Sequence, residues 1–288
     1  MSLPPSPFST VAVIGAGTMG HGIAQVCAAA GLTVRLYDLT EAAVARGADA
    51  VRANLDKGVA KGKLSADEAA ATLGRLSTTT ALAAAADGAD LVVEAIPEKL
   101  ALKQGLLREL APHLAPGAVF GTNTSSISIG AIAAAAPDPG AVVGLHFFNP
   151  VHIMALLEVI HHAGTTPAVL DAALRFGAAI GKECISVRDM PGFATSRLGV
   201  ALGMEAIRMV QDGVASAEDI DKAMVLGYRH PVGPLRLTDM VGLDVRLHIG
   251  EYLAGALGNP AFTPPPLMRE MVAAGKLGQK SGQGFYRW

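Results

Sequence analysis

The stretch VIGAGTMG at residues 13–20 decides the fold of the N-terminal part of the chain. A run of β-branched and small residues at 10–14 leads into it, and a helix-like run to Ala30 follows it. The next strand-like run, 33–38, ends in Asp38, 18 residues after the last glycine. A strand, three spaced glycines, a helix and an acid at the end of the next strand form a dinucleotide-binding pattern. The sequence therefore predicts an α/β domain with a mostly parallel sheet of the Rossmann type.

This pattern also predicts the cofactor. The glycines allow a tight turn and a close approach to a pyrophosphate, and the helix N-terminus stabilises the phosphate charge. Asp38 is expected to bind the ribose hydroxyls and to repel a 2′-phosphate, so NAD is favoured over NADP. The alternative is a glycine turn with an incidental acid. The cofactor-binding residues expected from the pattern are Gly15, Gly17, Thr18, Met19, Gly20 and Asp38.

Composition excludes several classes of function. The chain has 288 residues, is 51% hydrophobic and 17% charged, and carries a formal net charge of −2. This balance argues against nucleic-acid binding, and no apolar run is long enough to predict a membrane span. The first ten residues lack the features of a secretory signal. Cys27 and Cys184 show neither metal-site spacing nor a disulfide framework, so we expect no metal and a cytoplasmic location.

A second segment carries the candidate chemistry. Residues 141–148 form an apolar run that ends at Asn149-Pro150, and residues 156–160 form another. If the segment folds back as a hairpin, His146 and Glu158 come within hydrogen-bond reach. A carboxylate on one imidazole nitrogen fixes the tautomer, which suits a general base for an alcohol proton. The alternative is a core histidine and a glutamate on an exposed strand face.

Polar residues also follow other predicted strands. Asn123 and Ser125 come directly after the strand at 118–122, as His146 and Asn149 do at the end of theirs. Ligands of open parallel sheets bind beyond the C-terminal strand ends, which favours a functional role for His146. The predicted helix at 41–63 carries scattered lysines and arginines. From the residues alone, a solvent-exposed charged face is favoured for this helix over a basic surface that binds a phosphate-bearing substrate.

A breaker cluster at 189–192 predicts the domain boundary. We expect an NAD-binding domain over residues 1–189 and an all-helical substrate and dimerisation domain over 190–288. Helices are predicted in the second domain at 193–212, after a cap at Ser216, at 239–257 and at 265–274.

Together these residues resemble the L-3-hydroxyacyl-CoA dehydrogenase family, in its short bacterial 3-hydroxybutyryl-CoA form. The likeness extends from Val11 to Tyr286 and is carried by VIGAGTMG (13–20), VVEAI (92–96), NTSS (123–126), HFFNP (146–150), LEVI (157–160) and GQGFY (282–286). The resemblance implies a Rossmann-type domain, a helical domain that forms a homodimer, and an acyl-CoA substrate.

The resemblance also implies roles for single residues. His146 would take the 3-hydroxyl proton of an (S)-3-hydroxyacyl-CoA, Glu158 would orient the imidazole, and Ser125 would bind the substrate. The positions matching NAD contacts of the family are Asp38, Glu98, Lys103, Asn123, Asn149 and Lys280. Asn54 and Lys61 match positions that contact CoA in the family. The resemblance therefore favours a substrate-binding role for the basic helix at 41–63 over a merely solvated face.

One residue departs from the family pattern. Ser196 stands where the family usually has an asparagine near the catalytic pair. The resemblance therefore implies the reaction class but neither the substrate choice nor the rate. We expect Ser196 to face the substrate, and the alternative is a tolerated exchange with a water in the gap. Two other functions compete: a dehydrogenase of free hydroxy acids, of the gulonate type, and a weakly active NAD-binding sensor.

Overall fold

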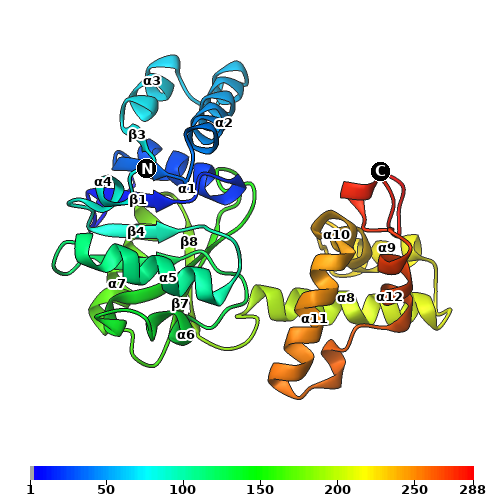
Figure 1. Cartoon of the computed structure of the whole chain (residues 1–288). Coiled ribbons are helices and arrows are strands. Elements are labelled where there is room, and N and C mark those ends of the chain that lie inside the picture. The colour runs from blue at the N-terminus through cyan, green and yellow to red at the C-terminus, as the bar shows by residue number, and fades with distance from the viewer. Residues whose placement is uncertain (1–2) are drawn as a thin grey trace. The chain divides into compact units, whose positions relative to one another are not determined.

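The computed structural model describes residues 3–288. It divides into two compact units, of which the first ends at Asp189 and the second begins at Met190. The first unit contains all eight strands, whereas the second is built from helices and short turns (Figure 1).

An eight-stranded sheet forms the centre of the first unit, in the order β3-β2-β1-β4-β5-β6-β7-β8. Neighbouring strands run parallel except for β6 and β7, which are antiparallel. The predicted α/β class with a mostly parallel sheet is therefore confirmed. The strands are β1 (Thr10–Ile14), β2 (Thr33–Tyr37), β3 (Leu76–Thr79), β4 (Leu91–Glu94), β5 (Val119–Thr122), β6 (Val142–Phe147), β7 (Leu156–His161) and β8 (Glu183–Arg188).

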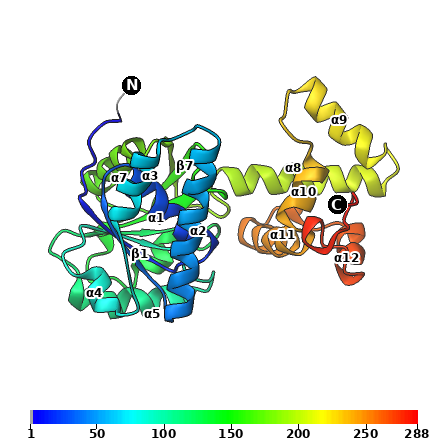
Figure 2. The same cartoon turned by 90° about the horizontal axis from the view of Figure 1, so that it is seen from above.

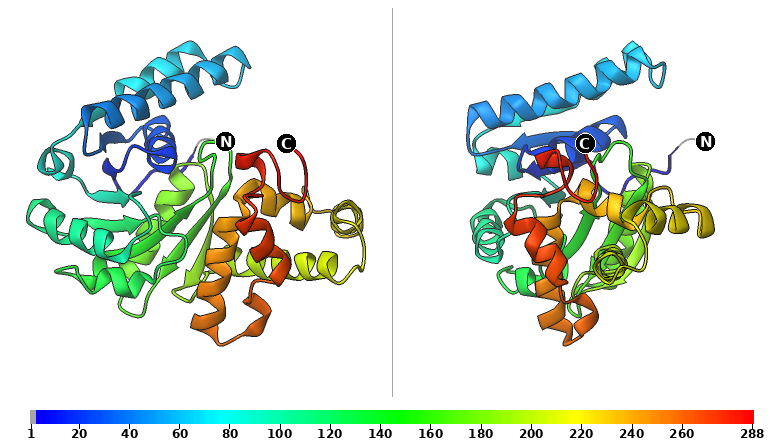
Figure 3. Two further views of the ribbon diagram at one scale, coloured as in Figure 1. Left: turned by 45° about the vertical axis from the view of Figure 1, so that its right-hand side comes forward. Right: turned by 90° about the vertical axis from the view of Figure 1, so that its right-hand side faces the viewer.

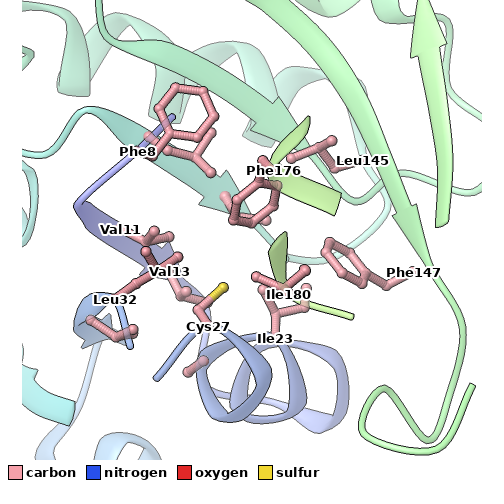
Figure 4. Packing of buried hydrophobic residues seen from close by; sticks show 14 of the residues in the cluster. Phe8, Val11, Val13, Ile23, Cys27, Leu32, Leu145, Phe147, Phe176 and Ile180 are labelled. Atoms are coloured by element: carbon pink, nitrogen blue, oxygen red, sulfur yellow. The ribbon is translucent and has the colours of Figure 1, made fainter. Parts of the chain in front are cut away.

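Helices cover both faces of this sheet, so its central strands must be apolar on both sides. Figure 2 shows α1 (Thr18–Ala29) and α7 (Pro167–Ala179) on one face, with α4 (Leu82–Ala86) and α5 (Leu100–Leu110) on the other. The core under α1 and α7 buries Val13, Ile23, Cys27, Phe147 and Phe176 (Figure 4). The remaining elements are α6 (Ile129–Ala133) and the short 3₁₀ turns η1 (Ala111–His113) and η2 (Pro139–Ala141).

Helices α2 (Glu41–Ala60) and α3 (Ala66–Gly74) form a hairpin that lies over α1 (Figure 3). Ser65 is the N-cap of α3 and forms a capping box with Glu68, which satisfies two backbone donors reciprocally. Val51, Leu55 and Ala69 form a small core of their own between the two helices. The predicted helix at 41–63 was three residues too long, because the chain turns at Lys61 and Gly62, which has a φ of +64°.

The second unit is the predicted helical domain. Its helices are α8 (Thr195–Gln211), α9 (Ala217–Gly227), α10 (Pro234–Val241), α11 (Leu243–Leu257) and α12 (Pro266–Ala273), with the 3₁₀ turns η3 (Pro260–Phe262) and η4 (Gln279–Ser281). Val200, Met204, Ile207 and Leu253 are among the residues of its core. The carboxylate of Asp239 accepts hydrogen bonds from the Phe285 and Tyr286 amides and from the Trp288 indole, which anchors the C-terminal segment.

Two predictions in this unit were wrong. The helix expected at 239–257 is two helices, because Gly242 has a φ of +104°, which an L side chain rarely adopts. The helix expected from residue 193 begins at Thr195, since Gly192 and Phe193 both have positive φ. In the first unit, the sequence analysis did not predict β3, α4 and α6, which are short and lack a clear hydrophobic period.

Candidate active site

The glycine-rich turn between β1 and α1 leaves space for a ligand at one position only. A Cβ on Gly15 would lie 2.7 Å from the Ala95 carbonyl oxygen, and one on Gly20 would lie 1.6 Å from that of Gly15. Both glycines are therefore required by backbone packing. A Cβ on Gly17 would meet nothing within 4 Å. Gly17 is also the N-cap of α1 and provides no side-chain cap, so the first turn of α1 can receive a phosphate.

A groove of about 760 Å³ starts at this turn. Thr18, Met19 and the carboxylate of Asp38 line it together with apolar residues such as Leu39 and Ile96. Asp38 accepts hydrogen bonds from the amides of Ala16 (2.8 Å) and Leu39 (2.7 Å), so its position is fixed by the turn itself. An open glycine, an uncapped helix start and a fixed carboxylate beside an apolar groove fit NAD.

Glu98 organises the polar loop after β5. Its Oε1 accepts hydrogen bonds from the Thr124 hydroxyl (2.6 Å) and from the amides of Ser125 (2.9 Å) and Ser126 (3.1 Å). Desolvation would raise the pKa of the Glu98 carboxyl, but Lys103 and the bonds from Thr124 and Ser125 hold that pKa below its ordinary value. Two predicted site residues, Glu98 and Ser125, are thus joined directly.

Lys103 lies deeper than the sequence reading expected. It is 0% exposed, and its amine lies 2.7 Å from Glu94 and 3.3 Å from Glu98. Glu94 is itself fully buried and also accepts hydrogen bonds from the Thr122 hydroxyl and the Ile96 amide. The sequence analysis did not predict the pair of Glu94 and Lys103, although a buried acid such as the one that ends the run LVVE (91–94) requires a partner.

Asn123 joins the ends of β5 and β6. Its Oδ1 accepts a hydrogen bond from the Phe147 amide at 2.9 Å, immediately after His146. Asn149 is exposed, two residues beyond the end of β6. Three predicted residues, Asn123, His146 and Asn149, therefore lie at or just beyond the C-terminal ends of β5 and β6.

The predicted hairpin is present, and it brings His146 and Glu158 together. The two residues are register partners across β6 and β7. Nδ1 of His146 lies 2.7 Å from Oε2 of Glu158. Glu158 is 0% exposed and His146 is 7% exposed, so the contact is screened from solvent while the imidazole retains a small accessible area. The ring of Phe148 packs against the imidazole at 4.5 Å between centroids.

A buried lysine supports the connection between β6 and β7, and the sequence reading missed it. The Lys182 amine donates hydrogen bonds to the carbonyls of Val151 and Met154. Burial lowers the pKa of Lys182. The side chain of Val151 is buried against Gly22, where a Cβ would come within 2.8 Å. The loop that links the strands of His146 and Glu158 is therefore fixed at both its backbone and its side chain.

The remaining expected residues lie away from this hairpin or in the second unit. Asn54 on α2 donates a hydrogen bond to Gln25 on α1 (3.1 Å), and Lys61 is the exposed C-cap of α2. In the second unit, Ser196 is the second residue of α8 and is half-buried. Lys280 forms an ion pair with Asp244 at 2.6 Å.

Two features are absent from residues 3–288. None of their helices is long and apolar enough to cross a membrane. Their histidines, cysteines and acids form no group of three or more that could hold a metal ion.

Comparison with known proteins agrees with this geometry. Residues 10–190 match the family model of the 3-hydroxyacyl-CoA dehydrogenase NAD binding domain, and residues 192–288 match that of the C-terminal domain. The chain is 42% identical over 280 residues to 3-hydroxybutyryl-CoA dehydrogenase of Mycobacterium tuberculosis, covering 96% of this chain and 98% of the relative. It is also 42% identical to 3-hydroxyadipyl-CoA dehydrogenase of Escherichia coli, covering 97% of this chain and 59% of that protein.

A solved structure shows the same similarity in three dimensions. The structure of (S)-3-hydroxybutyryl-CoA dehydrogenase from Ralstonia eutropha superposes with a TM-score of 0.94 at 40% identity, covering 98% of this chain and 99% of the other. The chain thus belongs to the 3-hydroxyacyl-CoA dehydrogenase family of NAD-dependent oxidoreductases, in its short bacterial form.

Proposed function

We propose that this enzyme oxidises (S)-3-hydroxyacyl-CoA, such as 3-hydroxybutyryl-CoA, to 3-ketoacyl-CoA and catalyses the reverse reduction, with His146 as the general base. The observation that carries the proposal is the 2.7 Å contact between Nδ1 of His146 and the buried carboxylate of Glu158. A carboxylate on Nδ1 fixes the tautomer in which Nε2 accepts a proton. It also stabilises the imidazolium that forms when the 3-hydroxyl proton is taken up.

Bound NAD⁺ would accept the hydride from C3. The chain's own part is to hold the cofactor, with its diphosphate at Gly17 and the first turn of α1 and its adenosine ribose at Asp38. We propose that Glu98, Asn123, Asn149 and Lys280 contact the cofactor. Because Lys103 is 0% exposed and its amine lies 3.3 Å from Glu98, we propose that it acts through Glu98.

The substrate would be held by residues from several elements. We propose that the Ser125 hydroxyl, which lies 3.3 Å from Oε1 of Glu98, hydrogen-bonds the substrate oxygen or the thioester region while Glu98 fixes its loop. Asn54 and Lys61 on α2 would meet the CoA moiety, where a lysine supplies a charge for phosphate. Ser196 would face the acyl group.

The direct test is reduction of acetoacetyl-CoA with NADH by the purified enzyme. We expect turnover that depends on the thioester, because the CoA moiety supplies binding energy at a distance from the reacting carbon. Free acetoacetate at the same concentration serves as the control. Comparable kcat/KM for the free acid would favour the hydroxy-acid alternative and contradict this proposal.

We also propose that the second unit mediates a homodimer. Its surface carries large apolar side chains that are at least 40% exposed, namely Met190, Leu198, Val214, Leu226, Tyr228, Met240, Val241, Val245 and Tyr252. Exposed apolar groups of this size are typical of interaction surfaces. Light scattering after size-exclusion chromatography should give twice the 29.4 kDa mass of one chain, and a monomer would contradict it. The cytoplasmic location stays a prediction.

A further inference from the structure

A buried guanidinium in the second unit lacks a counter-ion. Arg246 on α11 is 6% exposed. Its Nη1 donates a hydrogen bond to the Gly199 carbonyl of α8, whereas its Nε is buried without a partner. None of the ion pairs within residues 3–288 includes Arg246. A buried charge that is not paired is costly, so its presence requires an explanation.

Three acids on helices α9, α10 and α11 of this unit have other partners. Asp239 accepts hydrogen bonds from the C-terminal segment, and Asp244 pairs with Lys280. Asp221 accepts bonds from the amides of Leu235 and Arg236 and from the Tyr286 hydroxyl. Burial lowers the pKa of Arg246 to about 10, so the guanidinium remains charged at neutral pH.

The face of α8 that contacts Arg246 consists of small residues. A Cβ on Gly203 would lie 2.7 Å from Nη1, and a Cβ on Gly199 would lie 3.9 Å from Nη2. Ser196, Gly199 and Gly203 share this face, because residues three and seven apart lie on one side of a helix. The rise of 1.5 Å per residue places Gly199 and Gly203 roughly 5 to 10 Å along α8 from Ser196. Gly199 and Gly203, with the Arg246 guanidinium packed against them, thus follow Ser196 along one face of α8.

We infer that Arg246, with the Ser196–Gly203 face of α8, binds a carboxylate at the far end of the acyl chain of the substrate. The inference rests on the proposed function, in which Ser196 faces the acyl group. An acyl-CoA derived from a dicarboxylic acid brings the missing anion with its chain. Arginine suits this task because its planar fork matches a carboxylate and is more weakly hydrated than an ammonium group.

The test compares two substrates of equal chain length that differ only at the far end. The probes are 3-oxoadipyl-CoA, which ends in a carboxylate, and 3-oxohexanoyl-CoA, which ends in a methyl group. With NADH, the wild-type enzyme should favour 3-oxoadipyl-CoA in kcat/KM by at least about tenfold, the low end for a hydrogen bond to a charged group. Reduction of both probes with equal efficiency would overturn the inference and leave the proposed function standing. Failure to reduce any acyl-CoA would contradict the proposed function itself.

Variants then assign the preference to Arg246. Arg246→Met should lower the ratio of the two kcat/KM values by about 10- to 100-fold. Gly203→Ala should lower it too, because the new methyl group would displace Nη1. Arg269→Met, at an exposed arginine paired with Glu251, is the matched control and should keep the wild-type ratio. Circular dichroism identifies a variant that fails to fold. In that case, the ratio of the two kcat/KM values of the wild-type enzyme alone decides whether the inference holds.

One further outcome would also overturn the inference. If Arg246 pairs with an acid of a second copy of the chain, Arg246→Met should change the mass measured by light scattering while the substrate ratio stays at its wild-type value. A lowered ratio at unchanged mass supports a carboxylate supplied by the substrate.

Discussion

Two buried carboxylates of the first unit, Glu94 and Glu158, have cationic partners of different chemistry. Both are 0% exposed and both lie on inner strands of the sheet, β4 and β7. Glu94 pairs with Lys103 at 2.7 Å, and Glu158 pairs with His146 at the same distance. An ammonium group carries only donors, whereas an imidazole has one ring nitrogen that can donate and another that can accept a proton. The first pair is suited to hold structure and the second to move a proton, although the two separations are equal.

The largest expected effect separates chemistry from folding at the histidine. His146→Gln should lower kcat for acetoacetyl-CoA by about 10² to 10⁴, the usual contribution of a positioned general base. Glu158→Gln should also lower kcat, because a neutral amide stabilises an imidazolium poorly. NADH binding, measured by fluorescence titration, should persist in His146→Gln. Near wild-type turnover in that variant would remove the distinction between the two pairs.

The first pair, Glu94 and Lys103, should show the opposite behaviour. Lys103→Met leaves the buried carboxylate of Glu94 without its cation, and breaking such a pair costs about 3 to 5 kcal/mol of unfolding free energy. Urea denaturation monitored by circular dichroism measures this cost. Lys99→Met, at an exposed lysine just before α5, is the control and should change little. Equal stability of the two variants would show that Lys103 is not needed to hold Glu94.

A third carboxylate, Asp38, extends the comparison because backbone amides rather than a cation hold it. A 2′-phosphate about 4 Å away would be repelled by about 1 to 4 kcal/mol. Catalytic efficiency with NADH should therefore exceed that with NADPH by about one to three decades. Initial rates at matched concentrations measure this preference, and equal efficiencies would argue against ribose binding by Asp38.

The smallest effect concerns a hydroxyl group instead of a charge. If the exchange at Ser196 merely leaves a water-filled gap, Ser196→Asn should raise or preserve turnover of acetoacetyl-CoA. If serine makes room for a bulkier or substituted acyl group, the variant should lose activity on that group alone. One hydrogen bond to a neutral group is worth about 0.5 to 1.5 kcal/mol, so changes of at most about tenfold are expected. If Ser196→Asn and Ser196→Ala both leave every acyl-CoA unaffected, Ser196 does not face the substrate.

The sequence predicted those parts of the fold that depend on local pattern. The glycine turn, Asp38 and the hairpin with His146 and Glu158 are all set by strand ends and spacing, and each appears as expected in the structure. Lys103 could be assigned only a family role, because its burial depends on Glu94 on a separate element.

The features that were missed depend on contacts distant in sequence. Lys182 meets the carbonyl of Val151, 31 residues away, and Arg246 meets that of Gly199, 47 residues away. The break at Gly242 was missed because an isolated glycine within an apolar helical pattern is tolerated in many helices. A positive φ there could not be read from the residues alone.

The anchored C-terminal segment gives this protein a built-in optical probe. Trp288 is the single tryptophan of the chain, and Arg236 lies over its ring at 4.8 Å while its indole nitrogen donates to Asp239. All three residues belong to the second unit. Tryptophan fluorescence should therefore follow the melting of the helical unit alone, while far-ultraviolet dichroism follows both units. Comparing the two signals during one thermal scan would reveal whether the units melt together or in sequence.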